Sequence, residues 1–356
     1  MSEHSKFPPS SAEAWLECSG WLHFNAAMPD TTTPAADRGT RLHEEASKRL
    51  SGAASGVLAE DDEILVTSYV EYVRALVAEL PEARLLVETR VHLNEDVWGT
   101  ADAIIVSRNR MDVVDFKSGS RRVSAKNNAQ LAVYGAAALR APGMFEHHGP
   151  PFDVALHIVQ PAVDHISVWE ITPERLENFR LNVEVAVDNA KAAPVYRPSE
   201  TACRWCKGKA VCRARADFNL TIVAQDFAAL SETDLARLLP QIGQIRKWAD
   251  DLEARAMELA QSDKLPGYAI RTKPGARFWA DPLAAIDALV QAGVDPALAS
   301  KSSPLGIGAA EKLLGKTHPV FEQFCSQREG TQSLIRVEAA SSPALGVTPL
   351  TNVKGD

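Results

Sequence analysis

The chain has 356 residues, of which 46% are hydrophobic and 6% aromatic, and its formal net charge is -8 from 38 basic and 46 acidic residues. This composition excludes a disordered or fibrous chain and predicts a globular protein with a full core and room for two domains. Because the net charge is negative, a nucleic-acid partner needs a local basic patch rather than the whole surface.

The same composition bears on the compartment. No apolar run reaches the length that spans a bilayer, and the opening MSEHSKFPPS lacks both the basic start and the apolar stretch of a signal peptide. We therefore expect a cytoplasmic protein with no membrane partner. In that reducing compartment the five cysteines do not predict a disulfide framework.

The first two thirds of the chain alternate helical and strand-like patterns. Apolar residues three and four apart predict helices over 61–80 and 125–140, and another helix begins with Thr172 as cap and Pro173 in its first turn. Short apolar runs bounded by turn residues predict strands at 84–93, 98–106, 111–119, 152–161 and 165–172. This order predicts an α/β or α+β core, with a small mixed sheet flanked by helices.

Beyond residue 220 the pattern changes. Residues 231–262 predict a long amphipathic helix, bent near Pro240. A hairpin and two short helices are predicted at 268–279, 281–293 and 309–315. We therefore expect domains at 1–220 and 221–356, the second smaller, mostly helical and ending in a loose tail from Ser341.

Charged residues stand at the end of an otherwise apolar strand, MDVVDFKSG. Asp115 and Lys117 are two apart and so share a face, and Asp102 lies in the preceding strand, shortly after Gly99, which permits close backbone approach. Two carboxylates can hold a divalent cation that polarises a phosphoryl oxygen and lowers the pKa of bound water, while the lysine faces a phosphate or the attacking water. The alternative is a strand-end salt bridge beside a solvated turn.

Further polar residues lie in the flanking helices. Gln130 and Tyr134 are four apart on one helix face, from which they can reach a nucleic-acid backbone or orient Lys117. Residues Gly39 to His43 open a helix, and His43 offers a neutral imidazole ligand. Each feature has a plainer alternative, namely a packed helix face for the first and a helix-surface histidine for the second.

In order along the chain, these residues resemble the RecB-like branch of the PD-(D/E)xK nuclease superfamily. That family's pattern reads G-T-x-x-H, an acidic strand residue, G-x-x-D, D-x-K and Q-x-x-x-Y. Here the pattern corresponds to Gly39 to His43, Glu88, Gly99 to Asp102, Asp115 to Lys117, and Gln130 to Tyr134. The resemblance covers residues 11 to about 215 and implies a restriction-endonuclease-like core.

The resemblance also implies roles for these residues. It implies that His43, Asp102 and Asp115 bind Mg2+ or Mn2+ and that Lys117 is the catalytic lysine. Glu88, Gln130 and Tyr134 complete the implied catalytic site. For Glu88 there is a plainer alternative, which is an ion pair with Arg90.

The cysteines form a separate pattern. Cys203, Cys206 and Cys212 give a C-x2-C-x5-C cluster that needs a fourth thiolate, and Cys18 precedes the core. The resemblance implies that these four hold a 4Fe-4S cluster that staples the two ends of the nuclease domain. Spacing alone favours tetrahedral zinc. Cys325 is left over as an unpaired thiol.

Basic residues surround these cysteines with no acid among them, and Trp205 lies between the thiolates. The basic residues are Arg204, Lys207, Lys209, Arg213 and Arg215. Cations interleaved with an aromatic residue fit a single-stranded DNA track, where phosphates meet cations and bases stack. The alternative is a solvated basic loop with Trp205 packed on the cluster.

Together these features predict a metal-dependent deoxyribonuclease, which is a phosphodiester hydrolase acting on single-stranded DNA or DNA ends. The resemblance implies an exonuclease of phage or bacterial DNA recombination or repair, with a recombination protein as a partner. The alternative is a non-catalytic DNA-binding or scaffold protein that kept the fold. The intact Asp102, Asp115 and Lys117 favour the enzyme. Residues 221–356 resemble the tail of an uncharacterised family of phage-associated RecB-like proteins, which gives them no role.

Overall fold

The computed structural model describes residues 5–29, 33–146, 149–151, 153–223, 230–299, 305–327 and 331–336. The chain divides into two compact units, Met1–Trp248 and Ala249–Asp356. This division falls within the helix α9 (Glu232–Gln261), which contains Pro240. The domain boundary after residue 220 stays a prediction.

The first unit is built on a mixed sheet. Within the described residues it has five strands in chain order: β1 (Arg84–His92), β2 (Trp98–Val106), β3 (Arg110–Phe116), β4 (Asp153–Gln160) and β5 (His165–Ile171). Neighbouring strands are antiparallel except β3 and β4, which are parallel. A parallel pair needs a crossover, and α5 (Ala129–Leu139) provides it. This sheet confirms the predicted mixed α/β fold with a restriction-endonuclease-like core.

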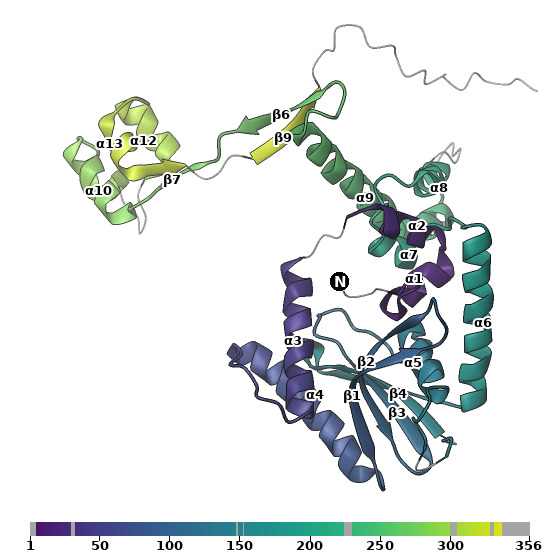
Figure 1. Ribbon diagram of the computed structural model, residues 1–356. Coiled ribbons are helices and arrows are strands. Elements are labelled where there is room, and N and C mark those ends of the chain that lie inside the picture. The colour runs from purple at the N-terminus through teal and green to yellow at the C-terminus, as the bar shows by residue number, and fades with distance from the viewer. Residues whose placement is uncertain are drawn as a thin grey trace, which may run out of the picture. The chain divides into compact units, whose positions relative to one another are not determined.

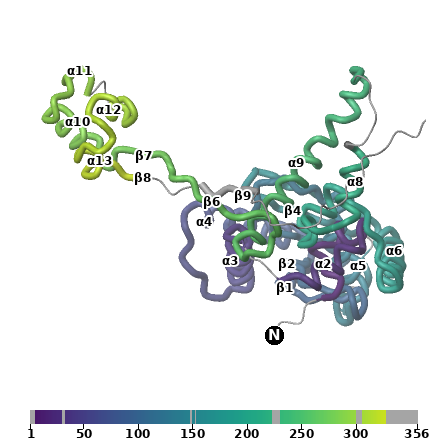
Figure 2. Tube along the Cα trace, turned by 90° about the horizontal axis from the view of Figure 1, so that it is seen from above, coloured from purple at the N-terminus to yellow at the C-terminus, as the bar shows by residue number. Residues whose placement is uncertain are grey.

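Helices cover both faces of the sheet (Figures 1 and 2). One face is covered by α3 (Pro34–Leu50) and α4 (Glu60–Glu79), and the other by α5 and α6 (Pro173–Ala192). Because strand side chains alternate, Ile105 packs with Leu42 on the first face while its neighbour Ile104 packs with Leu131 on the second. The sheet therefore lies between two apolar layers.

Helix caps set where these helices begin. Thr172 accepts a hydrogen bond from the Arg175 backbone N–H and Pro173 opens α6, as predicted. The same combination of Thr33 and Pro34 opens α3. The expectation that Gly39 to His43 open a helix is therefore wrong. These residues lie inside α3, because the stronger start signal precedes them.

The N-terminal and cysteine-bearing segments also belong to this unit. They form η1 (Pro9–Ser11), α1 (Ala12–Glu17), α2 (Gly20–Ala27), α7 (Glu200–Arg204) and α8 (Arg213–Val223), and η2 (Pro161–Val163) links β4 to β5. The helix α1 packs on both α5 and α7. Trp15 of α1 is buried and donates its indole N–H to the Pro8 carbonyl at 3.0 Å. The helix α1 therefore links the cysteine-bearing segment to α5.

The second unit contains two antiparallel strand pairs within the described residues. β6 (Tyr268–Lys273) pairs with β9 (Thr331–Arg336), and β7 (Arg277–Trp279) pairs with β8 (Cys325–Gln327). Lys273 lies opposite Thr331 and Arg277 opposite Gln327, so both pairs have the same register. The predicted hairpin at 268–279 is therefore wrong, because each of its arms pairs with a later segment.

Between β7 and β8 the chain forms four helical segments within the described residues. They are α10 (Pro282–Gln291), α11 (Pro296–Ala299), α12 (Ile307–Leu314) and α13 (Pro319–Phe324). Leu289, Ala310 and Phe321 are at the centre of their own small core. The predicted tail from Ser341 lies outside the described residues. Among the described helices, none has the length and apolar character needed to cross a membrane.

Candidate active site

The predicted charged trio comes together where β2 and β3 end their pairing. The last paired residues are Ala103 and Val114. Beyond them, the Asp102 carboxylate takes the place of a backbone acceptor, because its Oδ2 accepts the Phe116 backbone N–H at 2.7 Å. Asp115 is buried on the α5 side of β3. The end of the β2–β3 ladder thus brings the two carboxylates near each other.

Asp115, Lys117 and Gln130 form a closed ring of polar contacts. Lys117 Nζ lies 2.8 Å from Asp115 Oδ2 and donates to Gln130 Oε1 at 2.9 Å. Gln130 Nε2 in turn donates to Asp115 Oδ1 at 2.8 Å. Asn128 caps α5 by accepting the Leu131 N–H, which fixes the helix start that carries Gln130. Gln130 therefore contacts Lys117 directly, and its predicted role of orienting this lysine stays a prediction.

The ring leaves one oxygen incompletely satisfied. Asp115 Oδ2 is buried and has no hydrogen bond of ordinary geometry within the described residues, although it forms the ion pair with Lys117. Burial raises the pKa of Asp115 despite the nearby ammonium. Burial lowers the pKa of Lys117, but the charge of Asp115, its hydrogen bond with the lysine and the charge of Asp102 together outweigh burial. The net shift is upward, which keeps the lysine charged.

A second group of side chains surrounds Asp102. One ligand atom from each of His43, Glu88 and Asp102 lies within 4.8 Å of the others. His43 Nδ1 is 3.1 Å from Asp102 Oδ1, and its ring packs against Phe116 at 5.1 Å between centroids. The imidazole is thus directed into the site rather than standing alone on the helix surface. The carboxylate oxygens of Glu88 and Asp102 are ligands that suit Mg2+ or Mn2+, and the imidazole adds a nitrogen donor.

Glu88 enters this group through an unusual backbone conformation. The β1–β2 register places it opposite Asp102, and its φ of 45° lies in the left-handed region that non-glycine residues rarely adopt. Burial, followed by the charge of Asp102, raises the pKa of Glu88. Arg90, its expected alternative partner, instead lies over the Trp98 ring at 4.6 Å. Two facing carboxylates repel each other, and a bound cation would relieve that repulsion.

The hydrogen bond to Asp102 also acts on His43. Burial alone lowers the pKa of His43, but the hydrogen bond and charge of Asp102 outweigh it and give a net upward shift. The residues around this ligand group form an open hollow lined by Gly39, Thr40, His43, Glu44, Ser47, Lys48, Glu88 and Asp102. Asp115 does not belong to the group of His43, Glu88 and Asp102, and its carboxylate forms an ion pair with Lys117. Its predicted contact with the metal therefore stays a prediction.

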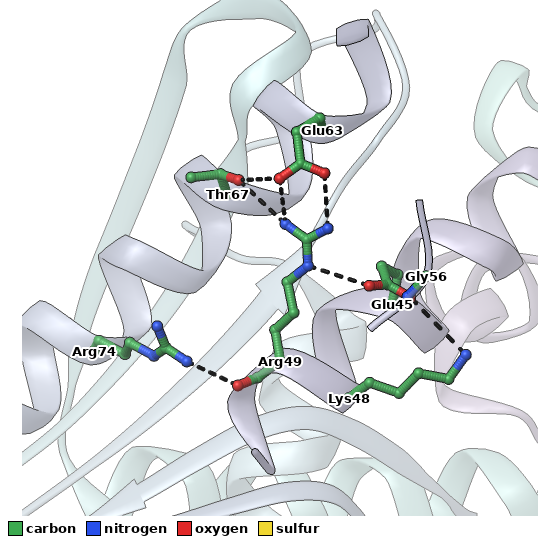
Figure 3. A network of polar contacts seen from close by, with 7 residues as sticks. All are labelled: Glu45, Lys48, Arg49, Gly56, Glu63, Thr67 and Arg74. Atoms are coloured by element: carbon green, nitrogen blue, oxygen red, sulfur yellow. Dashed lines mark hydrogen bonds and ion pairs between the residues drawn. The ribbon is translucent and has the colours of Figure 1, made fainter. Parts of the chain in front are cut away.

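A polar network holds α3, and with it His43, against α4 (Figure 3). Arg49 donates to both oxygens of Glu63 at 2.6 and 2.8 Å and to Glu45 at 3.2 Å. Arg38 and Arg41, which precede His43 in α3, both bind Asp62 at the start of α4. These contacts fix the position of α3 along α4 and thereby the height of the imidazole over the sheet.

Gly99 and Tyr134 have packing roles. A Cβ at Gly99 would lie 2.9 Å from Pro9 and 3.1 Å from Tyr134, so the glycine makes room for protein side chains. Tyr134 is buried, and burial raises its pKa, as does the charge of Asp115. It lies beside Gln130, which opposes that shift through a hydrogen bond. Its hydroxyl is therefore a further contact of Gln130, the residue that binds Lys117.

The four predicted cysteine ligands line one small cavity. Cys18 at the end of α1, Cys203 in α7, and Cys206 and Cys212 after it surround this space together with Trp21, Phe24 and Tyr196. The Arg197 backbone N–H donates to Cys18 Sγ at 3.3 Å. Burial raises the pKa of Cys206 to about 11. Cys325 lies in β8 of the second unit.

Two glycines permit the close approach of the segments that carry these thiols. A Cβ at Gly20 would lie 2.3 Å from the Tyr196 ring, and one at Gly208 would lie 2.1 Å from the Phe24 ring. Four sulfurs in one cavity, with a backbone N–H directed at one of them, are a donor set that fits a metal or an iron-sulfur cluster.

The basic residues of the cysteine segment do not form one solvated row. Lys207 Nζ donates to the carbonyls of Asn25 and Met28 at 3.1 and 3.0 Å. Arg215 is buried and donates to the Lys209 carbonyl. Trp205 is 78% exposed, so the alternative in which it packs on the cluster is wrong. Within this segment, Lys207 and Arg215 have structural contacts.

Sequence reasoning missed Arg121, which shares a groove with Lys117, Gln130, Arg204 and Trp205. A signal for it was present. Ser118, Gly119 and Ser120 predict a turn directly after β3, and a turn there returns Arg121 toward the strand end.

Comparison with solved structures finds distant likenesses. One is to the protein SSO0001, at 14% identity and a TM-score of 0.29, covering 60% of this chain and 89% of that one. Another is to an alkaline exonuclease from Laribacter hongkongensis, at 9% identity and a TM-score of 0.21, covering 51% of this chain and 91% of that one. A family model matches residues 4–340, and the chain thus belongs to the family described as protein of unknown function (DUF2800).

Proposed function

We propose that this protein is a metal-dependent deoxyribonuclease of the RecB-like branch of the PD-(D/E)xK superfamily. The observation that carries the proposal is the pairing of two groups at one strand end. Lys117 is held by Asp115 and Gln130, and beside it His43, Glu88 and Asp102 form a set of potential ligands. A DNA-binding scaffold has no need for this combination.

Each residue has a role in the proposed hydrolysis. His43, Asp102 and Glu88 would hold Mg2+ or Mn2+, with Asp115 as a further ligand, and the ion would polarise the phosphoryl oxygen and activate a water. Lys117 directs its charged N–H groups at the oxygen on which negative charge develops. Gln130 keeps that ammonium from turning away, because it binds both Lys117 and Asp115.

The test is cleavage of end-labelled single- and double-stranded DNA by the full chain, with Mg2+, Mn2+ or EDTA. We expect cleavage with either metal and none with EDTA. Lys117→Ala should abolish cleavage while most DNA binding remains. The matched control Lys126→Ala removes an exposed lysine that does not line the site and should cleave normally. A folded protein that binds DNA but does not cleave it with either metal would favour the scaffold function instead.

The finer assignment is an exonuclease that acts on DNA ends in recombination or repair. A linear and a covalently closed circular substrate of the same sequence separate the two activities. We expect degradation of the linear form only. Cleavage of the closed circle would make the protein an endonuclease.

We also propose that Cys18, Cys203, Cys206 and Cys212 bind a 4Fe-4S cluster, with zinc as the competing occupant. Three observations support a site for a metal group. The four thiols share a cavity, a backbone N–H donates to Cys18, and Gly20 and Gly208 allow the Tyr196 and Phe24 rings to approach closely. Such a group would join the N-terminal helix to the end of the nuclease domain, and its role would be structural.

A further inference from the structure

A groove lies beside Lys117 and is distinct from the hollow around His43. Its lining includes Glu13 of α1, Lys117 and Arg121 after β3, and Arg204 and Trp205 of the cysteine segment. Its charged side chains are three cations and one carboxylate. In a chain of net charge -8, this is the kind of local basic patch that a nucleic-acid strand requires.

Trp205 presents its ring to solvent at this groove. Its exposed fraction is 78%, although it stands between two cysteines whose segment is tightly packed. The hydrogen bonds of Lys207 to the Asn25 and Met28 carbonyls anchor the backbone that carries it. A large exposed aromatic ring on an anchored backbone is a stacking platform for an unpaired base.

Arg121 lines the same groove as Trp205 and offers a positive charge for a phosphate. Its backbone carbonyl accepts a hydrogen bond from the buried Gln160 side chain at 2.6 Å, which fixes the loop. Its guanidinium is exposed and makes no hydrogen bond or ion pair within the described residues. By contrast, Arg204 pairs with Glu200, and Lys207 binds carbonyls. Arg121 is therefore the groove cation best placed to take a phosphate.

We propose that Trp205 and Arg121 form a subsite for single-stranded DNA next to the catalytic lysine. A base of the strand stacks on Trp205, a phosphate pairs with Arg121, and the adjoining phosphodiester reaches Lys117. A duplex does not suit the site, because its bases are already stacked on one another and offer no free face. The inference rests on the proposed nuclease function for its purpose, but the binding step itself needs no cleavage.

The test is fluorescence anisotropy of labelled single-stranded and duplex oligonucleotides with the full chain in EDTA, where cleavage is excluded. Trp205→Ala should weaken single-strand binding by about 5- to 150-fold, the range that loss of one stacked base gives. Trp205→Phe should keep most of the affinity. The control Phe218→Ala removes another exposed aromatic side chain, outside the groove, and should bind as the unchanged protein does.

The phosphate contact has its own readout. Arg121→Ala should lower the slope of log affinity against log salt by about one. Arg108→Ala removes the same charge from an exposed residue at the other end of β3 and should leave the slope unchanged. Unchanged single-strand affinity in Trp205→Ala, or an equal loss for duplex, would overturn the subsite.

The two proposals fail separately. Single-strand binding that depends on Trp205, without cleavage in Mg2+ or Mn2+, would overturn the nuclease and support the subsite. Cleavage by the unchanged protein, with single-strand binding indifferent to Trp205, would overturn the subsite alone.

Discussion

At the scale of single residues, the site consists of a ring of polar contacts around Lys117 and a ligand group that depends on strand pairing. Asp115 and Lys117 share a face because strand side chains alternate, and Gln130 lies only a short crossover away, so local patterns suffice for this ring. Glu88 depends on the pairing register of β1 with β2 and on a left-handed backbone. Neither feature has a signal in the local sequence.

Glu88 gives a direct test of the metal group. Saturating Mn2+ should stabilise the unchanged protein, by about 2.7 kcal/mol when the ion is at a hundred times its dissociation constant. Glu88→Gln keeps the shape but removes one ligand charge, so most of this gain should be lost. In EDTA the variant should be no less stable than the unchanged protein, because the repulsion with Asp102 is gone. Thermal unfolding with Mn2+ and with EDTA measures both effects.

Glu44 supplies the control, since it lines the same hollow but lies outside the three-ligand group. Glu44→Gln should retain the Mn2+ stabilisation. Equal stabilisation of Glu88→Gln and Glu44→Gln would remove Glu88 from the metal site.

At the scale of elements, two predictions are wrong because each rests on a short local pattern. The helix start was predicted at the motif Gly39 to His43. The capping pair Thr33 and Pro34, which is also present in the sequence, is the actual start of α3. The turn residues Pro274 and Gly275 predicted a hairpin at 268–279, yet the partner strands begin only at Cys325. A turn signal says that the chain can bend there, whereas pairing is decided by segments far away in sequence.

The contact between α3 and α4 predicts a pH dependence. Burial raises the pKa of Asp62, but its bonds with Arg38 and Arg41 outweigh this and hold the pKa below its ordinary value of 3.8. A carboxylate with a lowered folded-state pKa adds stability above its unfolded pKa, and this stability is lost as pH falls through the folded value. Asp62→Asn should therefore cost about 1 kcal/mol at neutral pH, a small value because both arginines are partly exposed.

Below pH 3.8 that difference should shrink toward zero, because the unchanged protein then loses the same charge. Thermal unfolding of both proteins across this range measures it. Asp61→Asn, an exposed neighbour in the same first turn of α4, is the control and should show little loss at any pH. A constant difference between Asp62→Asn and the unchanged protein down to acid pH would contradict the ion-pair explanation.

At the scale of the whole molecule, the four thiols join segments that the sequence keeps far apart. Cys18 and Cys203 are separated by 185 positions, and no local pattern links them. The structure connects them through packing of α1 on α7 and through the aromatic contacts at Gly20 and Gly208. The spacing of Cys203, Cys206 and Cys212 indicates three ligands of one site, whereas the place of Cys18 beside them depends on the fold.

A metal group on these thiols would close a long loop and so restrict the unfolded chain. By analogy with covalent cross-links of long loops, Cys18→Ala and Cys206→Ala should each lose about 3–5 kcal/mol of stability together with the bound metal. Cys325→Ala, in the second unit, is the control and should keep both. We expect protein purified without oxygen to be brown and to contain iron and sulfide in near-equal amounts. Stoichiometric zinc without iron would replace the cluster by a zinc site, and full metal content in Cys18→Ala would show that the N-terminal helix is not stapled to the end of the core.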